Sequence, residues 1–558
     1  MATSVVSPLT RSARHAEPHS YLEKDRGFAL CLVTGLTLAS LAIHGYHPFA
    51  EDGGLYLAGI KRVLNPALYP YGSEFVLGHL RFSLFAPAVA AAVRWSGIGL
   101  ETTLLVIYLA SVWITLAAGW MLACGCFPSR KERAGAVSLL AMWLTLPIAG
   151  TSLMLMDPYV TARSISTPCT LLALVGALDF VISVRERECW QWSGLALAVA
   201  ALAVAGVMHP LMAAYGFGCV LVLGLAIPDG RGTRIAAMVG LCATVVMVVL
   251  VLETVAQPES AAYYSVAMSR YYWFLSEWHW YELVGLAAPL AILMAVMWRS
   301  PKSGDRARAA LAQMGLAVGM IAVVVAAIFA REGAATHLVA RLQPLRVFQQ
   351  VYVVMILFVG AALAGWMSRQ WLRWGAVFSL LAVVMFTAER QTFPASAHLE
   401  LPQLHEAEDS NAWVQAFRWI KANTPVNAVF AMDADYITRP GEDAQGFRAI
   451  AERSALPDYS KDGGEAAITP ALTGAWTAGQ TAQSKLSERS DAERMAALAP
   501  EGVGWVILQR SAATSFACDY ANAEVKVCRL PSADSADGVR LSFRSHPALQ
   551  RPQVQATQ

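Results

Sequence analysis

The chain has 558 residues, of which 56% are hydrophobic and only 15% are charged. Soluble proteins carry about 25% charged residues, so this composition excludes an ordinary soluble protein and indicates a membrane protein. The net charge is +2, and no cluster of Lys and Arg is interleaved with aromatic residues, which excludes nucleic acid as an expected partner.

The start of the chain predicts a cytoplasmic tail followed by a first membrane span. Residues 1–27 are polar and basic, and the apolar run 28–46 has no small-residue cleavage site before His47. We therefore expect a retained span rather than a removed signal peptide. A long external loop, 47–101, comes next. Its apolar stretch 82–93 is too short to cross a bilayer, which favours an interfacial helix.

Two adjacent carboxylates stand directly after the first span. Glu51 and Asp52 precede a Gly-Gly joint and a short amphipathic stretch. A carboxylate whose pKa is raised by apolar surroundings could take the proton of an acceptor hydroxyl, and the pair could instead bind a divalent cation. In the alternative interpretation Asp52 only caps a helix that starts near Gly54, and Glu51 is solvated.

Eleven apolar runs have about the length that a span requires. They are 28–46, 102–124, 135–156, 168–184, 191–208, 211–227, 235–252, 282–298, 309–330, 350–367 and 374–388. Five basic joints alternate with joints that are poorer in positive charge: Ser129–Arg133, Val184–Glu188, Asp229–Arg234, Arg299–Arg308 and Arg369–Arg373. Because cytoplasmic loops collect Lys and Arg, the N-terminus and these joints should be cytoplasmic and the C-terminus external, provided that 82–93 does not cross.

Two further external loops carry candidate binding residues. Asp157 and Arg163 join the third and fourth spans, where Asp157 could share one site or one cation with the acids of the first loop. An Asp-Pro turn with Arg163 at a lipid headgroup is the alternative. The loop 253–281 holds Arg270 and Tyr271 among many aromatic rings, which is typical of an interfacial belt but also suits a phosphate and a stacked sugar.

Two arginines precede the tenth span. Arg341 and Arg346 flank Pro344, and their bidentate, permanently charged donors suit a lipid-linked phosphate. Anchoring to lipid headgroups is the competing interpretation.

The chain becomes polar after about residue 388, and 389–535 predicts a separate external α/β domain followed by a disordered tail, 536–558. One amphipathic helix and two buried strands are indicated by the apolar pattern. The helix face is Trp413, Phe417 and Ile420, and the strands are 428–432 and 504–508. Cys518 and Cys528 could form a disulfide if this domain faces an oxidising compartment.

The layout resembles the membrane-embedded glycosyltransferases of the C-type fold, the GT-C superfamily. The resemblance rests on Glu51 and Asp52 in a long first external loop, on Asp157 in the second, and on an external C-terminal α/β domain. The run W-I-K-A-N-T-P-V-N-A-V-F is similar to the start of that domain in several such families. The resemblance implies a polyprenyl-phosphate sugar as donor, a first-loop acid as base or metal ligand, and arginines that hold the phosphate. The first loop lacks a D-x-D motif and the domain lacks W-W-D, so oligosaccharyltransferase activity is not expected.

The expected function is the transfer of a sugar from this lipid-linked donor to an unidentified acceptor at the external face of a bacterial inner (cytoplasmic) membrane, with the C-terminal domain in the periplasm. A transporter or flippase, or a non-catalytic envelope-assembly protein, is the alternative. A transporter should show ionisable residues or Gly/Pro breaks at mid-span in two related halves, and neither is clear in the sequence.

Overall fold

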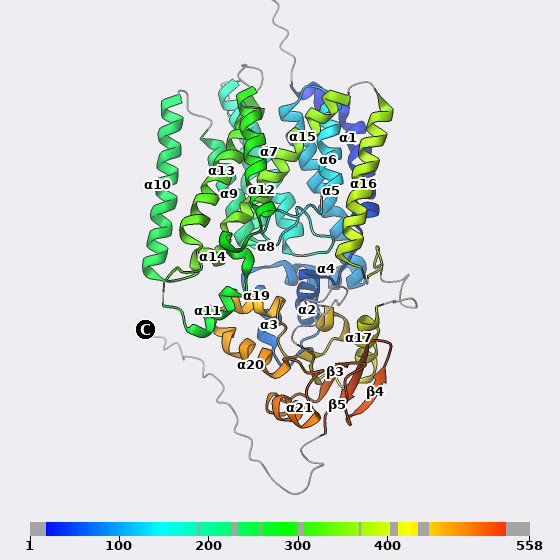
Figure 1. Ribbon diagram of the computed structural model, residues 1–558. Helices are drawn as coiled ribbons and strands as arrows, with labels where there is room; N and C mark the ends of the chain where they lie inside the picture. Colours follow the sequence, from blue (N-terminus) through cyan, green and yellow to red (C-terminus); the bar gives the residue numbers. More distant parts are fainter. Residues whose placement is uncertain are drawn as a thin grey trace, which may run out of the picture.

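The structure is a computed structural model that describes residues 18–186, 190–225, 231–256, 258–299, 306–367, 370–394, 396–401, 411–433 and 446–531. The predicted tail 536–558, most of the tail 1–27 and parts of four basic joints lie outside the described residues. A bundle of helices forms the larger part of the described chain, and a sheet with short helices lies at one end of the bundle (Figure 1).

Each predicted span overlaps a helix, although α6 covers only the first part of 135–156. These helices are α1 (Pro18–His44), α5 (Leu100–Cys126), α6 (Arg130–Met142), α7 (Ala162–Glu186), α8 (Trp192–Met208), α9 (Pro210–Gly224), α10 (Arg231–Val255), α12 (Trp280–Arg299), α13 (Arg306–Phe329), α15 (Phe348–Met367) and α16 (Trp371–Thr392). Within the described residues, eight stretches are long and apolar enough to cross a membrane, and α8 and α9 are shorter apolar helices. The chain is thus a multi-pass α-helical membrane protein.

The predicted span 135–156 is helical only in its first part. α6 ends at Met142, and the chain then runs without a helix to the start of α7. Pro147 lacks the backbone N–H that a helix interior needs, and Ala149 and Ser152 adopt positive φ angles of 46° and 52°. Most of this segment is buried, and irregular backbone is tolerated within a membrane protein where protein covers it.

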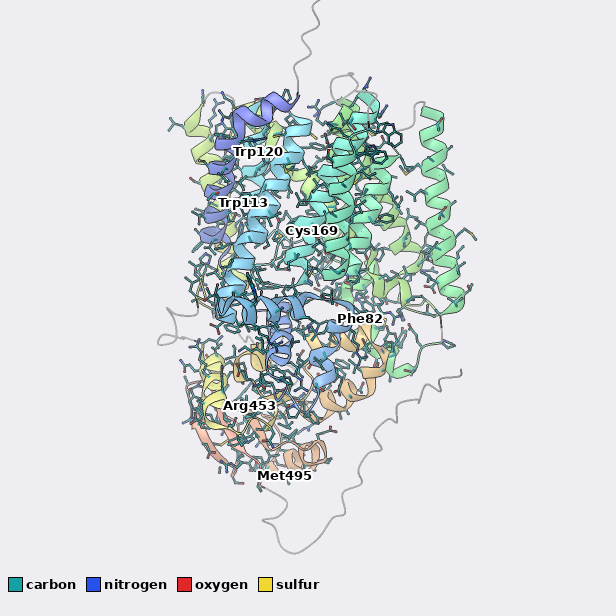
Figure 2. All side chains as sticks on the ribbon, turned by 180° about the vertical axis from the view of Figure 1, so that it is seen from behind. Phe82, Trp113, Trp120, Cys169, Arg453 and Met495 are labelled. Atoms are coloured by element: carbon teal, nitrogen blue, oxygen red, sulfur yellow. A yellow bond between two sulfur atoms is a disulfide. The ribbon has the colours of Figure 1, made fainter. Side chains whose placement is uncertain are left out.

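The segment 82–93 lies at the end of the bundle. It belongs to α4 (Phe85–Ser96), which follows α3 (Ser73–Leu77) and the 3-10 helix η1 (His79–Phe82). The stretches Ser73–Phe82 and Phe85–Ser96 meet at 95°, so the pair would be a ninth crossing only as a broken span. Figure 1 places α4 where the bundle meets the C-terminal part, and Figure 2 shows Phe82 at this level, below Trp113 and Cys169.

The two ends of the bundle differ in character. α1, α6, α8, α10, α13 and α16 run toward the sheet, and the other helices of the bundle run away from it (Figure 1). The helix ends that flank the five basic joints therefore gather at the end remote from the sheet. The segments that follow α1, α6, α10 and α13 gather at the end that meets it, as the charge alternation predicts.

The C-terminal part contains a five-stranded sheet in the order β2-β1-β3-β5-β4. The strands are β1 (Val429–Ala431), β2 (Ser454–Ala455), β3 (Trp505–Gln509), β4 (Ala517–Ala521) and β5 (Val525–Arg529). β1 pairs in parallel with β2 and β3, while β5 pairs antiparallel with β3 and β4. The two predicted strands are β1 and β3, and a disulfide joins Cys518 of β4 to Cys528 of β5.

Short helices cover the sheet and connect it to the bundle. They are α2 (Asp52–Leu64), α11 (Ala261–Met268), α14 (Leu338–Leu342), α17 (Ala412–Asn423), α18 (Phe447–Ala451), α19 (Lys461–Ile468), α20 (Thr473–Gln483) and α21 (Asp491–Leu498). Trp413, Phe417 and Ile420 of α17 are buried in one apolar cluster with the sheet residues Phe430 and Val527, which confirms the predicted helix face.

α6 and α15 cross in direct backbone contact. A Cβ atom on Gly135 would lie 2.5 Å from the Cβ of Ala364, and a Cβ on Gly360 would lie 2.5 Å from the carbonyl oxygen of Gly135. Both distances are shorter than any ordinary van der Waals contact, so a side chain fits at neither position. Small residues of this kind let membrane helices approach closely.

Gly360→Val should therefore destabilise the protein, by about 1–3 kcal/mol for an overpacked contact. Thermal unfolding in detergent measures the change. Gly365→Val is the matched control, because Gly365 lies on the same helix and a Cβ there has no neighbour within 4 Å. Equal stability of the two variants would contradict the close crossing.

Candidate functional site

Asp52 lies between two cations from distant parts of the chain. Its Oδ2 accepts a 2.9 Å hydrogen bond from Arg163 Nη2, and its Oδ1 lies 3.1 Å from Lys461 Nζ. The same ammonium group lies 2.5 Å from Glu51 Oε2. Arg163 also donates to Asp157 Oδ2 from Nε at 3.1 Å and from Nη2 at 2.9 Å. These five residues, three carboxylates and two cations, are called the acid cluster below.

The turn between α1 and α2 brings the first-loop acids to the start of α7. Glu51 precedes α2 with φ 50° and ψ −129°, a backbone conformation that costs a non-glycine residue about 1–3 kcal/mol and is commonest at functional sites. A Cβ on Gly53 would lie 2.7 Å from the carbonyl oxygen of Pro48 and 3.0 Å from Tyr159 Cβ. Only glycine allows this close approach, which sets Asp52 beside the segment that carries Asp157.

The structure contradicts Asp52 as a helix cap and Arg163 as a headgroup anchor, while Glu51 is 44% exposed, as the first alternative expects. Asp52 does not cap α2, because it is the first residue of the helix and the preceding Glu51 makes no side-chain cap bond. Arg163 does not extend to a lipid headgroup, since its side chain is only 7% exposed and bonds to two carboxylates. A buried charge of this kind needs partners, and Asp52 and Asp157 are those partners.

The charges of the cluster fix one another's ionisation. Burial raises the pKa of Asp52, but Lys461 and Arg163 outweigh burial and hold that pKa well below its ordinary value. Burial lowers the pKa of Lys461, yet Asp52 and Glu51 raise it above its usual range. Burial raises the pKa of Asp157, and Arg163 offsets this only in part. Asp52 and Lys461 are therefore both charged at neutral pH.

A neutral pair extends the cluster toward α3. His79 Nδ1 lies 3.7 Å from Glu465 Oε1, and the His79 ring packs against Tyr56 with 4.7 Å between centroids. Burial lowers the pKa of His79 to about 4. Burial, with Asp462 and Asp52 nearby, raises the pKa of Glu465 to about 8. Both ring nitrogens of His79 are buried without a hydrogen-bond partner.

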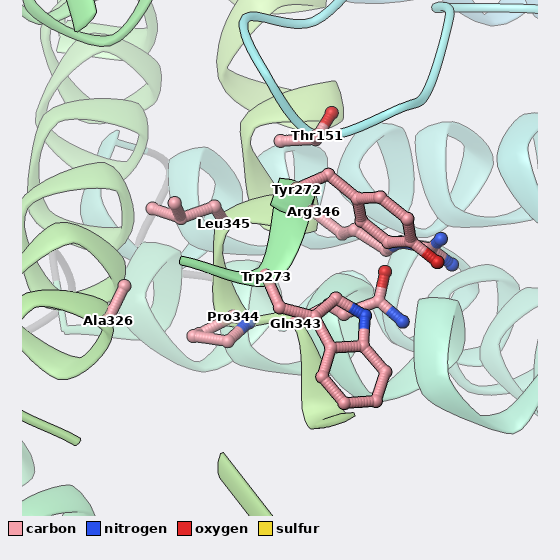
Figure 3. Close-up of a pocket in the computed structure, with 8 residues that line it drawn as sticks. All are labelled: Thr151, Tyr272, Trp273, Ala326, Gln343, Pro344, Leu345 and Arg346. Atoms are coloured by element: carbon pink, nitrogen blue, oxygen red, sulfur yellow. The ribbon is translucent and has the colours of Figure 1, made fainter. Parts of the chain in front are cut away.

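Arg346 lies near the acid cluster and not within it. It lines a pocket with Thr151, Tyr272, Trp273 and Gln343 (Figure 3), and its Nε is buried without a hydrogen-bond partner. Asp52 and Arg163 are close enough to act on its charge. The pocket has a volume of about 10 Å³, close to the space of one water molecule, so a phosphate requires it to open.

The other predicted binding residues lie elsewhere. Arg270 donates to the carbonyl oxygens of Tyr459 and Ser460 at 2.9 and 2.7 Å, and Arg341 donates to that of Ile468 at 3.4 Å. Tyr271 is 52% exposed. The two arginines thus hold the segment around α19 against the bundle.

Lys461, His79 and Glu465 were not identified from the sequence. Lys461 begins α19 in the run S-K-D-G-G, where nothing distinguishes it from an ordinary surface lysine. The one local signal is Gly463, where a Cβ would lie 2.7 Å from Arg270 Nη2 and 3.0 Å from Trp476 Nε1. That signal becomes interpretable only when the packing is known.

The residues expected to hold a divalent cation have other counterions. Within the described ranges, no group of three His, Cys, Asp or Glu side chains is arranged to hold a metal ion. Glu51, Asp52 and Asp157 instead face Arg163 and Lys461.

Comparisons with known proteins find similarity to solved structures. No protein-family model matches the sequence, and a search of curated proteins finds no match. A solved structure of the archaeal oligosaccharyltransferase AglB from Archaeoglobus fulgidus, in complex with an inhibitory peptide and a dolichol-phosphate, matches with a TM-score of 0.47 and 10% sequence identity. The match covers 88% of this chain and 70% of that chain. At this level of likeness, neither activity nor substrate is inferred from it.

The raised pKa of Glu465 predicts a pH-dependent stability. A carboxyl group whose pKa is higher in the folded state stabilises the fold at low pH, and this contribution is lost as the pH rises through the folded value of about 8. Unfolding measured at pH 5, 6.5 and 8 should show a decline that Glu465→Gln reduces. Glu488→Gln, at an exposed site in the same part of the chain, should leave the decline unchanged. An unaltered decline in Glu465→Gln would refute the assignment.

Proposed function

We propose that this chain is a membrane glycosyltransferase that moves a sugar from a polyprenyl-phosphate donor to an acceptor hydroxyl. The observation that carries the proposal is the acid cluster at one end of the bundle. Carboxylates and cations meet there, where the helices end and a lipid-linked phosphate would sit. A site that must accept a proton and stabilise a departing phosphate needs both kinds of group.

The proposed reaction has a simple balance. The acceptor oxygen forms a bond to the anomeric carbon, and the bond from that carbon to the phosphate oxygen breaks. The electron pair of the broken bond stays on the phosphate, which leaves as polyprenyl phosphate with one additional negative charge. The acceptor proton passes to Asp52 or Glu51 as general base. Arg163 and Arg346 are the arginines nearest to the departing phosphate in this proposal.

We further propose that the site faces the external, periplasmic side of a bacterial inner membrane. The basic joints gather at the opposite end of the bundle, which suits the cytoplasm. The disulfide between Cys518 and Cys528 suits an oxidising compartment. In this proposal residues 28–388 form the membrane domain and 389–535 the external domain.

The test is transfer by purified protein in lipid, supplied with radiolabelled polyprenyl-phosphate sugars. Combined Glu51→Gln and Asp52→Asn should lower the rate by about 10²-fold or more, the usual contribution of a general base. Asp519→Asn is the control. Asp519 of β4 pairs with Arg529 of β5, which is 63% exposed, and neither residue belongs to the acid cluster.

Unchanged transfer in the double variant would end the base assignment. Absence of transfer by the wild-type protein with every polyprenyl-phosphate sugar would contradict the proposed function itself.

A further inference from the structure

The segment before Lys461 is held in place by side chains that donate hydrogen bonds to its backbone. The four carbonyl oxygens of residues 457–460 all accept hydrogen bonds from side chains. The donors are Gln480 and Gln483 to Pro457, Trp476 to Asp458, and Arg270 to Tyr459 and Ser460. Arg270 belongs to the loop before α12, so the bundle side of the chain directly holds this segment of the C-terminal part.

Two aspartates, of which Asp462 is fully buried, complete the support. Asp458 Oδ1 accepts a 2.6 Å hydrogen bond from the backbone N–H of Lys461, and the backbone N–H of Asp458 donates to Asp462 Oδ2 at 2.8 Å. Arg448 neutralises Asp462 from 2.7 Å. The backbone N–H of Lys461 is thus held by Asp458, while its ammonium group stands at the end of a flexible four-carbon stem.

The ammonium group of Lys461 reaches the open edge of the acid cluster. Glu51, which it contacts, is 44% exposed, whereas Asp157 at the far side of the cluster is only 7% exposed. Asp52 has a second cation in Arg163, bound to its other oxygen. Lys461 can therefore leave Asp52 without removing that carboxylate's last counterion.

We propose that Lys461 binds the phosphate of the lipid-linked donor, and that its ammonium group leaves Glu51 and Asp52 to do so. This inference rests on the proposed function. An ammonium group is a compact charge that binds phosphate well, and its effect is greatest as the phosphate departs with additional negative charge. Removal of Lys461 from Asp52 also lets the pKa of Asp52 rise. Arrival of the donor would thereby leave Asp52 paired with Arg163 alone and make it a stronger base.

The binding test uses the full chain in lipid nanodiscs with polyprenyl monophosphate as the probe. Lys461→Gln should weaken binding about tenfold or more, since a hydrogen bond to a charged group contributes about 1.5–3 kcal/mol. Lys461→Arg should keep most of the affinity. Lys485→Gln is the matched control, an exposed lysine of the same C-terminal part, and should bind like the wild type.

The outcomes separate the two proposals. If the wild type binds the probe and Lys461→Gln binds it equally well, this inference is overturned and the proposed function stands. An equal loss in Lys485→Gln also overturns it. If the wild type does not bind the probe, the proposed function fails and this inference fails with it.

The pH dependence of transfer distinguishes a lysine that binds phosphate from one that only holds α19 against Glu51 and Asp52. In the proposal Lys461 has already left Asp52 when the donor is bound, so Lys461→Gln should shift the acid limb of kcat/KM to higher pH and leave that of kcat in place. A lysine that stays beside Asp52 as a structural counterion would shift both limbs, and that result would overturn the inference. If Lys461→Gln does not fold, carbodiimide labelling of Asp52 in the wild type replaces this measurement. Carbodiimide reacts with protonated carboxyl groups, so labelling should increase when polyprenyl monophosphate is added, and unchanged labelling would overturn the inference.

Discussion

The double pairing of Asp52 with Arg163 and Lys461 is the interaction on which the rest of the site depends. Asp52 follows α1 and begins α2, Arg163 lies in the first turn of α7, and Lys461 begins α19. One carboxylate therefore joins the first loop, the bundle and the C-terminal part. Asp52 holds Arg163 and Lys461 close together, although the two cations repel each other. Each of these charges is tolerated beside the apolar bundle because it is paired.

The same pairing explains why the C-terminal part belongs to the site. Arg270 and Arg341 contact backbone carbonyls around α19, and Lys61 of α2 contacts Glu452 at 2.7 Å. Tyr263 of α11 donates to the carbonyl oxygen of Ala467 at 2.8 Å. Polar contacts from several loops thus orient the segment around α19. In our account this orientation places Lys461 at the acid cluster.

The sequence predicts the bundle well because hydrophobic length and charge alternation are local properties. It fails in the second part of the predicted span 135–156, because α6 ends at Met142 and Pro147 cannot continue a helix through the rest of the run. Within the site, Glu51, Asp52, Asp157 and Arg163 are found because each stands beside a predicted span end. Lys461 is missed because its partners lie in the first loop, and only the tertiary structure brings the start of α19 close to them. Arg270 is predicted from the sequence to bind a ligand because it lies among aromatic rings. In the structure it donates instead to the backbone carbonyls of Tyr459 and Ser460.

The central claim is that Asp52 and Lys461 interact directly, and a double-mutant cycle tests it most directly. Unfolding free energies of the wild type, Asp52→Asn, Lys461→Gln and the double variant give the coupling between the two side chains. We expect a favourable coupling in the range of about 0.5–3 kcal/mol that contacting residues show. Strict additivity of the two substitutions would contradict the contact and the site built around it.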